Sequence, residues 1–132
     1  MKTVENPLSK NQAVLIVDDY PELLKTVTRM LRRSGYSKVF QATNGQDCVQ
    51  LAQENVIDMI LLDISMPGIS GMDTCRTLRS TAMNKRAYII ACTAHANVKN
   101  RETFLQAGFD DILLKPFGYP ELMDKLKGAQ NK

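Results

Sequence analysis

The sequence predicts an α/β domain built on a parallel sheet with helices on both faces. Two unbroken apolar runs, residues 13–17 and 59–62, lack the polar alternation of half-exposed strands, so both should be buried on two faces. Between such runs lie stretches in which apolar residues recur at helical spacing, and short turns connect the two. This alternation is typical of strand–helix–strand units. An Asp follows each run, at the strand end where open α/β sheets place their sites.

Each expected element has a local signal. Pro21 suits the first position of a helix because its φ is fixed and it lacks an N–H, and Ser34 with Gly35 ends that helix. Gly108 stops a later helix in the same way. Strands are expected at 13–17, 38–42, 57–63, 87–92 and 111–114, and helices beginning at about 21, 45, 72, 97 and 120.

The strand order then brings polar side chains together. Five strands and five helices in 132 residues favour a flavodoxin-like (βα)5 doubly wound parallel sheet with strand order 2-1-3-4-5. Because this order pairs the first strand with the third, Asp18 and Asp19 should meet Asp63 at one edge. Thr93 follows the fourth strand and Lys115 the fifth, so both are expected at the same edge.

Composition indicates a single cytoplasmic domain. Hydrophobic residues make up 44% and charged residues 23% of the chain, which is ordinary for a globular protein. No apolar stretch approaches the roughly 20 residues that span a bilayer, and residues 1–12 contain no apolar signal core. We expect a flexible N-terminal arm at 1–12, the domain at 13–128, a C-terminal tail at 129–132 and no membrane contact.

Cysteine usage and charge exclude two further classes. Cys48, Cys75 and Cys92 are odd in number and far apart, so zinc and a disulfide framework are not expected, and the thiols should be reduced and close to the core. The net charge is only +3. No reader motif for nucleic acid accompanies the few clustered arginines, so nucleic-acid binding is not expected.

The three carboxylates need a cation. Acidic groups within a few ångströms repel and would raise one pKa. A hard divalent ion resolves this, and Mg²⁺ fits best because it takes carboxylates, waters and a phosphate, with Mn²⁺ as the alternative. Asp19, Asp63 and the backbone carbonyl of Ser65 would be ligands, with Asp18 acting more distantly through water.

A carboxylate beside such an ion can attack phosphorus and become an acyl phosphate. Asp63 is the expected nucleophile because its strand is central and a turn leaves its end open. The negative charge on the transferring phosphoryl group must be neutralised, by the ion, by the ammonium of Lys115 and by the hydroxyl of Thr93.

Four separated motifs carry a family resemblance. Val17-Asp18-Asp19, Leu61-Leu62-Asp63 with Met66-Pro67-Gly68, Thr93-Ala94 and Leu114-Lys115-Pro116 resemble the signature of response-regulator receiver domains, and the likeness covers residues 14–127. The resemblance implies phosphoryl transfer to Asp63 from a histidine kinase or histidine phosphotransfer protein, with Mg²⁺. It also implies slow self-catalysed hydrolysis, hence a phosphoacceptor and not a turnover enzyme, and a cis Lys115–Pro116 peptide bond.

The same resemblance implies how the signal leaves the domain. A downstream protein would read the face made by the fourth helix, fifth strand and fifth helix. This chain departs from the family at the switch position, where Ile112 replaces an aromatic residue. Either the switch is smaller than in the family, or shifts of loops and of the fourth helix carry the output. Ser65, Ala94 and His95 occupy the family's positions that tune hydrolysis. Ser70 should cap the third helix, and Gly71 is expected to supply a special backbone conformation.

Several readings stay open beside this one. The chain would be a single-domain regulator or phosphorelay shuttle, monomeric or weakly dimeric on phosphorylation, or else the receiver of a hybrid histidine kinase. A phosphorylation-independent pseudo-receiver would lack an acid, the Thr or the Lys, and none is missing. A haloacid-dehalogenase-type phosphatase would need a second Asp where Ser65 stands. A flavin carrier would need a phosphate-binding loop where Asp18 and Asp19 would repel phosphate.

Overall fold

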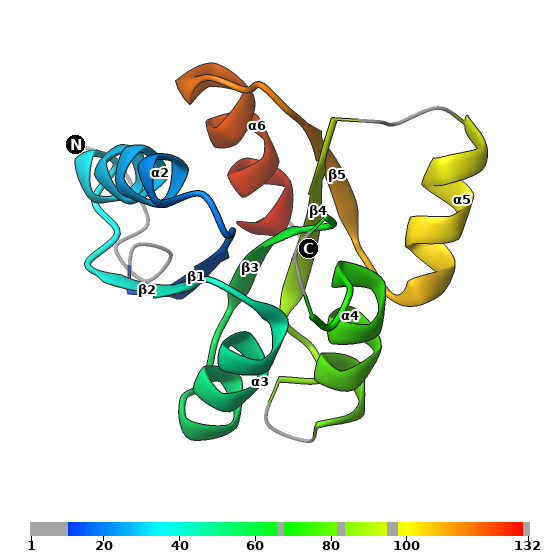
Figure 1. The fold of residues 1–132 in the computed structure, drawn as a ribbon. Coiled ribbons are helices and arrows are strands. Elements are labelled where there is room, and N and C mark those ends of the chain that lie inside the picture. Colours follow the sequence, from blue (N-terminus) through cyan, green and yellow to red (C-terminus); the bar gives the residue numbers. More distant parts are fainter. Residues whose placement is uncertain (1–10, 66–67, 82–83, 95–97, 131–132) are drawn as a thin grey trace.

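A five-stranded parallel sheet forms the centre of the molecule (Figure 1). The computed structural model describes residues 11–65, 68–81, 84–94 and 98–130. The strands are β1 (Ala13–Val17), β2 (Lys38–Ala42), β3 (Met59–Asp63), β4 (Tyr88–Thr93) and β5 (Asp111–Leu114). The helices are α2 (Pro21–Arg33), α3 (Gly45–Glu54), α4 (Gly71–Ser80), α5 (Val98–Ala107) and α6 (Tyr119–Gln130). The strand order β2-β1-β3-β4-β5 confirms the predicted topology.

Helices cover both faces of the sheet, and each face has its own core. On one face, α2 and α6 pack against alternate residues of β1 and β3, such as Val14 and Leu61. On the other face, α3, α4 and α5 pack against the intervening residues, such as Leu15 and Leu62. β1 and β3 are buried along their whole length. The unbroken apolar runs therefore reflect burial on both faces, as predicted.

The central strand begins later than expected. Residues 57 and 58 precede β3, which starts at Met59. At residue 57 a side chain that the local pattern does not reveal replaces a strand partner, because the Ile57 N–H donates to Asn84 Oδ1 at 2.8 Å. The last helix, α6, begins at Tyr119, one residue earlier than expected, and ends at Gln130.

Side-chain caps fix the starts of two helices. Asn44 Oδ1 accepts the Asp47 N–H at 2.8 Å at the start of α3. Ser70 Oγ accepts the Asp73 N–H at 3.1 Å at the start of α4, which confirms the predicted cap. Such a cap contributes about 1 kcal/mol to helix stability. The start of α4 is thus fixed at Ser70 by its own side chain.

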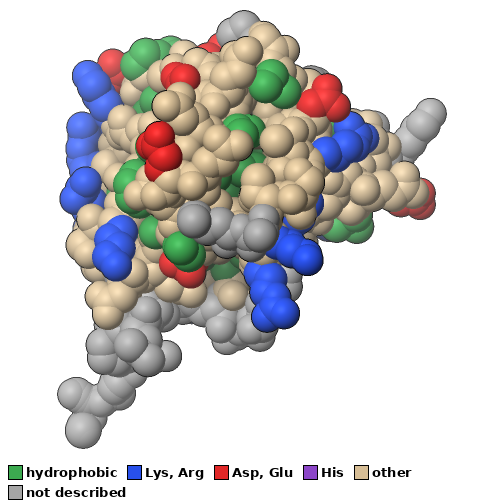
Figure 2. Space-filling model, turned by 90° about the horizontal axis from the view of Figure 1, so that it is seen from below, with side chains coloured by type: hydrophobic (Ala, Val, Ile, Leu, Met, Phe, Trp, Pro, Cys, Tyr) green, Lys and Arg blue, Asp and Glu red, His purple; other side chains and the backbone are tan. Residues whose placement is uncertain are grey.

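Surface charges of both signs are interspersed. Figure 2 shows Lys and Arg side chains toward the margins of one face, with Asp and Glu among them. Exposed pairs such as Lys25–Glu22 at 3.9 Å and Arg76–Asp73 at 2.9 Å join neighbouring turns of one helix. Pairs of this kind contribute at most about 1 kcal/mol each. The apolar clusters, and not surface ion pairs, hold the fold together.

The cysteines agree with the sequence-based expectation. Cys48, Cys75 and Cys92 are all buried with free thiols, which confirms the predicted reduced thiols in the core. Among the helices in the described part of the chain, none combines the length and apolar character needed to cross a bilayer.

Candidate functional site

The parallel sheet brings four strand ends together at one edge. Val17 pairs with Leu62, so Asp18 and Asp63 end adjacent strands. Thr93 ends β4 and pairs with Leu114, which directly precedes Lys115. The strand order and this register bring Asp18, Asp63, Thr93 and Lys115 to the same edge of the sheet, where open α/β folds carry their sites.

Three carboxylates form the centre of the site. One oxygen from each of Asp18, Asp19 and Asp63 lies within 4.8 Å of the others. Asp18 and Asp63 are buried, whereas Asp19 is exposed. Burial raises the pKa of Asp63, the charge of Asp18 raises it further, and Lys115 opposes both effects. Hard oxygen donors at this spacing suit a divalent cation such as Mg²⁺.

Lys115 offsets part of this negative charge. Its Nζ lies 2.7 Å from Asp18 Oδ2 and 3.2 Å from Asp63 Oδ1. Burial alone would lower the pKa of Lys115, but the hydrogen bond to Asp18 and the charge of Asp63 outweigh it, so the pKa is raised. The side chain is therefore a fixed ammonium at neutral pH. The Lys115–Pro116 peptide bond is cis, as the resemblance implied.

Backbone groups orient the acids. The Tyr20 N–H donates to Asp18 Oδ1 at 2.9 Å, and the Ser65 N–H donates to Asp63 Oδ1 at 3.3 Å. The Ile64 N–H donates to Cys92 O at 3.1 Å, which continues the β3–β4 ladder past Asp63. The Asp18 and Asp63 carboxylates are thus each held by the turn that follows their own strand.

The remaining predicted residues differ in burial, and some of them lie outside the described part of the chain. Thr93 is buried at the end of β4, and its carbonyl accepts the Lys115 N–H at 2.8 Å. Ala94, which directly follows Thr93, is exposed, and so is Ser65, two residues after Asp63. His95, together with Met66 and Pro67 of the motif after Asp63, lies outside the described residues.

Ile112 is part of the core. It is 5% exposed, pairs with Ala91 across β4 and β5, and belongs to the cluster that also contains Phe104 of α5. An aliphatic side chain that is packed in this way presents no polar group at the surface. On the neighbouring elements, by contrast, Leu105 of α5 and Leu114 of β5 are about half exposed.

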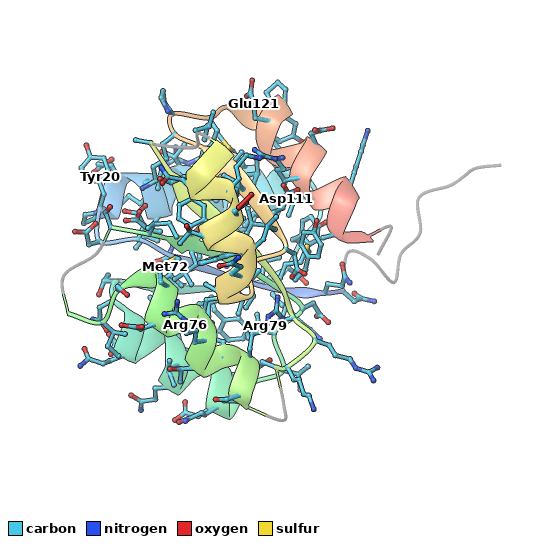
Figure 3. The ribbon with its side chains drawn as sticks, turned by 90° about the vertical axis from the view of Figure 1, so that its right-hand side faces the viewer. Tyr20, Met72, Arg76, Arg79, Asp111 and Glu121 are labelled. Carbon is cyan, nitrogen blue, oxygen red and sulfur yellow. The ribbon has the colours of Figure 1, made fainter. Side chains whose placement is uncertain are left out.

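A hollow of about 780 Å³ lies at the opposite edge of the sheet, where the strands begin. Three of its charged side chains already have partners within the domain: Arg79 pairs with Asp110 at 2.6 Å, and Asp58 Oδ2 accepts the Ala13 N–H at 2.7 Å. In Figure 3, Arg79 lies between α4 and α5, well away from Tyr20, which follows the acids of β1. The carboxylate edge, and not this hollow, has the chemistry of a reaction site.

Sequence reasoning missed one relationship in the site. It assigned Asp18 to the ion through water and Lys115 to the phosphoryl group, and did not anticipate that the two side chains pair directly. The residues are 97 positions apart. No local spacing signals that contact, because packing of β1 and β5 on opposite sides of β3 and β4 creates it.

Comparisons of sequence agree with this geometry. The family model for the response regulator receiver domain matches residues 14–127. The transcriptional regulatory protein PrrA of Mycobacterium tuberculosis is 39% identical over 114 residues, which are 86% of this chain and 48% of PrrA. The response regulator MprA of Mycobacterium sp. strain KMS is 37% identical over the same shares. The chain spans about half the length of these curated relatives.

Solved structures give the same result. The chemotaxis protein CheY4 of Vibrio cholerae superposes with a TM-score of 0.86 at 26% identity, over 90% of this chain and 98% of CheY4. The receiver domain of the sensor histidine kinase PA1611 of Pseudomonas aeruginosa PAO1, solved with a magnesium ion in its active-site cleft, gives a TM-score of 0.83 at 35% identity. That match covers 92% of this chain and 99% of the other.

Proposed function

The chain belongs to the response regulator receiver domain family, and from this we propose that it is a phosphoacceptor of two-component signalling with Asp63 as the nucleophile. One observation carries the proposal: Asp18, Asp19 and Asp63 lie within 4.8 Å of one another, with the Lys115 ammonium 3.2 Å from Asp63. The donor would be the phosphohistidine of a histidine kinase or of a histidine phosphotransfer protein.

The acidic cluster fits Mg²⁺. Asp18, Asp19 and Asp63 would hold the ion with the backbone carbonyl of Ser65, and Mn²⁺ would suit the same oxygen donors. The magnesium-bound receiver of PA1611 supports this assignment. When bound, the ion supplies positive charge at a phosphoryl oxygen.

The chain's own residues would perform the transfer in one displacement. An oxygen of the Asp63 carboxylate attacks phosphorus, the phosphorus–nitrogen bond of the donor imidazole breaks, and the imidazole leaves with the bonding electrons. Lys115 and the Thr93 hydroxyl would neutralise oxygens of the phosphoryl group. Water later cleaves the acyl phosphate and restores the carboxylate, so the domain resets slowly and does not turn over substrate.

The side chains at the mouth of the site would set the lifetime of this state. Ser65 and Ala94 are exposed beside Asp63 and Thr93, and His95 follows Ala94 in the chain. Ala94 is small and leaves room for water, whereas Ser65 and His95 would steer or block it. A larger residue at position 94 should slow hydrolysis.

The output would leave through the face formed by α5, β5 and α6. Leu105 and Leu114 expose apolar surface there, which a downstream protein could cover. Ile112 is buried in the core, so shifts of α5 and its loops, and not a swinging aromatic ring, would carry the change. Phosphorylation would favour either this protein partner or a weak dimer.

Relatives place receivers in two settings. PrrA and MprA are regulators, and the PA1611 receiver belongs to a sensor histidine kinase. A single-domain regulator or phosphorelay shuttle is the first proposal, and a hybrid-kinase receiver is the alternative. The chemistry at Asp63 is the same in each.

Intact-mass spectrometry tests the function. The wild type and Asp63→Asn are incubated with acetyl phosphate, with and without Mg²⁺. One added phosphoryl group in the wild type, absent in the variant and absent without Mg²⁺, is the expected result. If neither acetyl phosphate nor a phosphorylated histidine phosphotransfer protein modifies the wild type, the proposed function is wrong.

A further inference from the structure

The first residue of α4 touches the backbone of the phosphoacceptor strand. An ideal Cβ built on Gly71 would lie 2.7 Å from Asp63 O and 2.7 Å from Ile64 Cα. Real side chains do not approach backbone atoms so closely. Among the described glycines, positive φ occurs at Gly35, Gly68 and Gly108, so the expectation of a special conformation at Gly71 is wrong. Gly71 is required by close approach.

This contact acts on a segment that is already held from the other side. The Ile64 N–H donates to Cys92 O at 3.1 Å, and Ile64 O accepts the Gly71 N–H at 3.3 Å. The peptide after Asp63 is therefore clamped between β4 and α4. Asp63 has little freedom to move unless α4 moves with it.

The first turn of α4 is in turn fixed to its surroundings. Ser70 caps the helix, and Ser70 O accepts the Thr74 hydroxyl at 2.8 Å. A Cβ on Gly45, at the start of α3, would overlap Thr74 Oγ1. The start of α3 therefore packs directly against the first turn of α4 through the Thr74 side chain.

We propose that Gly71 is a positioning residue of the phosphoacceptor site, which sets the place of the Asp63 carboxylate and the following carbonyls through backbone contact. This inference rests on the proposed function. Because the atoms in contact are main-chain atoms, no side chain can yield to relieve an added methyl group. The backbone of residues 63–65 must shift instead, and the acidic cluster shifts with it.

The test compares Gly71→Ala with Gly45→Ala. Both variants introduce one methyl group at a tight helix start. The atoms nearest to a Gly45 methyl belong to Thr74 and Ile69, whereas those nearest to a Gly71 methyl belong to Asp63 and Ile64. Three quantities are measured: thermal stability, Mg²⁺ affinity by titration calorimetry on the unphosphorylated protein, and the rate of phosphorylation by acetyl phosphate, all well below the unfolding temperature.

Gly71→Ala should weaken Mg²⁺ binding about tenfold, as for loss of a supporting contact around a metal site. It should slow phosphorylation by up to about 100-fold, the effect of an ångström-scale misplacement. Gly45→Ala should lower stability but leave the Mg²⁺ affinity and the phosphorylation rate within about twofold of the wild type. Adding Thr74→Ala to the Gly45→Ala variant should recover stability. Equal Mg²⁺ affinity and rate in the folded Gly71→Ala and Gly45→Ala variants would overturn the proposal.

A second pair of variants tests the positioning role if Gly71→Ala does not fold. Ser70→Ala removes the cap that anchors the first turn of α4, and Ser80→Ala removes a hydroxyl at the far end of the same helix. Only Ser70→Ala should weaken Mg²⁺ binding, by about threefold or more; equal affinities would refute the positioning role. Since this comparison needs no phosphoryl transfer, failure of the wild type to accept phosphate would refute the function without deciding the role of Gly71.

Discussion

Lys115 Nζ lies closer to Asp18 Oδ2, at 2.7 Å, than to any oxygen of the expected phosphoacceptor Asp63, where the shorter contact is 3.2 Å. Both carboxylates are nearly inaccessible, at 2% and 6% side-chain exposure. A single ammonium therefore compensates two buried acids. Removing that ammonium leaves carboxylates without a positive partner, which is more costly than losing an exposed pair.

Replacing Lys115 with Met should lower stability by about 1–3 kcal/mol, because it keeps the stem and removes the charge. Mg²⁺ should restore much of that loss, since it binds the same acids in the folded state only. The matched control is Lys125→Met: Lys125 is equally accessible and pairs with Asp111 at 3.1 Å, away from the site. Thermal unfolding with and without Mg²⁺ measures both, and an equal response of the two variants to Mg²⁺ would contradict the prediction.

Asp63→Asn should stabilise the metal-free protein at pH 7. The folded pKa of Asp63 is raised, by burial and by Asp18, so Asp63 favours folding only in its protonated form. That contribution is complete below the ordinary pKa and is lost as the pH rises through the folded pKa. The melting temperature of the variant should exceed that of the wild type at pH 7 and equal it near pH 3. Each kcal/mol of added stability should raise the melting temperature by about 4 °C. Asp124→Asn, at an exposed position of α6, is the control; a lower melting temperature for Asp63→Asn at pH 7 would show the sign to be wrong.

The native thiols should be inert. Burial raises the pKa of Cys48 to about 12, of Cys75 to about 11 and of Cys92 to about 12. Thiolate is the reactive form, so an aromatic disulfide reagent at pH 8 should react negligibly with the folded protein and with three thiols per chain in denaturant. A single fast-reacting thiol in the native state would refute this.

Asn84→Ala should be among the most destabilising polar substitutions, by about 2–4 kcal/mol. The buried Asn84 amide donates to Ala52 O and accepts the Ile57 N–H, so its loss leaves buried backbone groups unpaired. Asn44→Ala, which removes only a helix cap, should cost about 1 kcal/mol. Denaturant unfolding measures both. The rate at which Asp63 accepts phosphate should not change, because Asn84 lies at the opposite edge of the sheet.

Arg79→Lys should lower stability by about 2 kcal/mol although the charge is kept. The guanidinium donates to Gly108 O at 2.9 Å, to Lys85 O at 3.1 Å and to Asp110 Oδ2 at 2.6 Å, and an ammonium cannot reach all of them. Arg76→Lys, on the same helix and in an exposed pair, should change stability by less than about 0.5 kcal/mol. Comparable losses in the two variants would show that the fork geometry of Arg79 is unimportant.

Element type, element order and the identity of the site residues could be predicted because each has a local signal. The unbroken apolar runs at β1 and β3 differ from the helical stripe of α2, and an Asp at each strand end marks the edge where the carboxylates gather. The parallel strand order then follows from alternation and short connections. The sequence by itself thus determined that Asp18, Asp19, Asp63, Thr93 and Lys115 would meet.

Only the tertiary structure decided which of these groups touch and what holds them in place. Lys115 pairs with Asp18, 97 positions away in the chain. The Ile57 N–H donates to the Asn84 side chain and not to a neighbouring strand. Because Gly71 has no Cβ, α4 can contact the backbone of Asp63. These contacts arise from the distances between packed elements, and side-chain periodicity along one segment contains no information about those distances. Local patterns therefore determine the helices, the strands and their order, and close packing determines the geometry of the site.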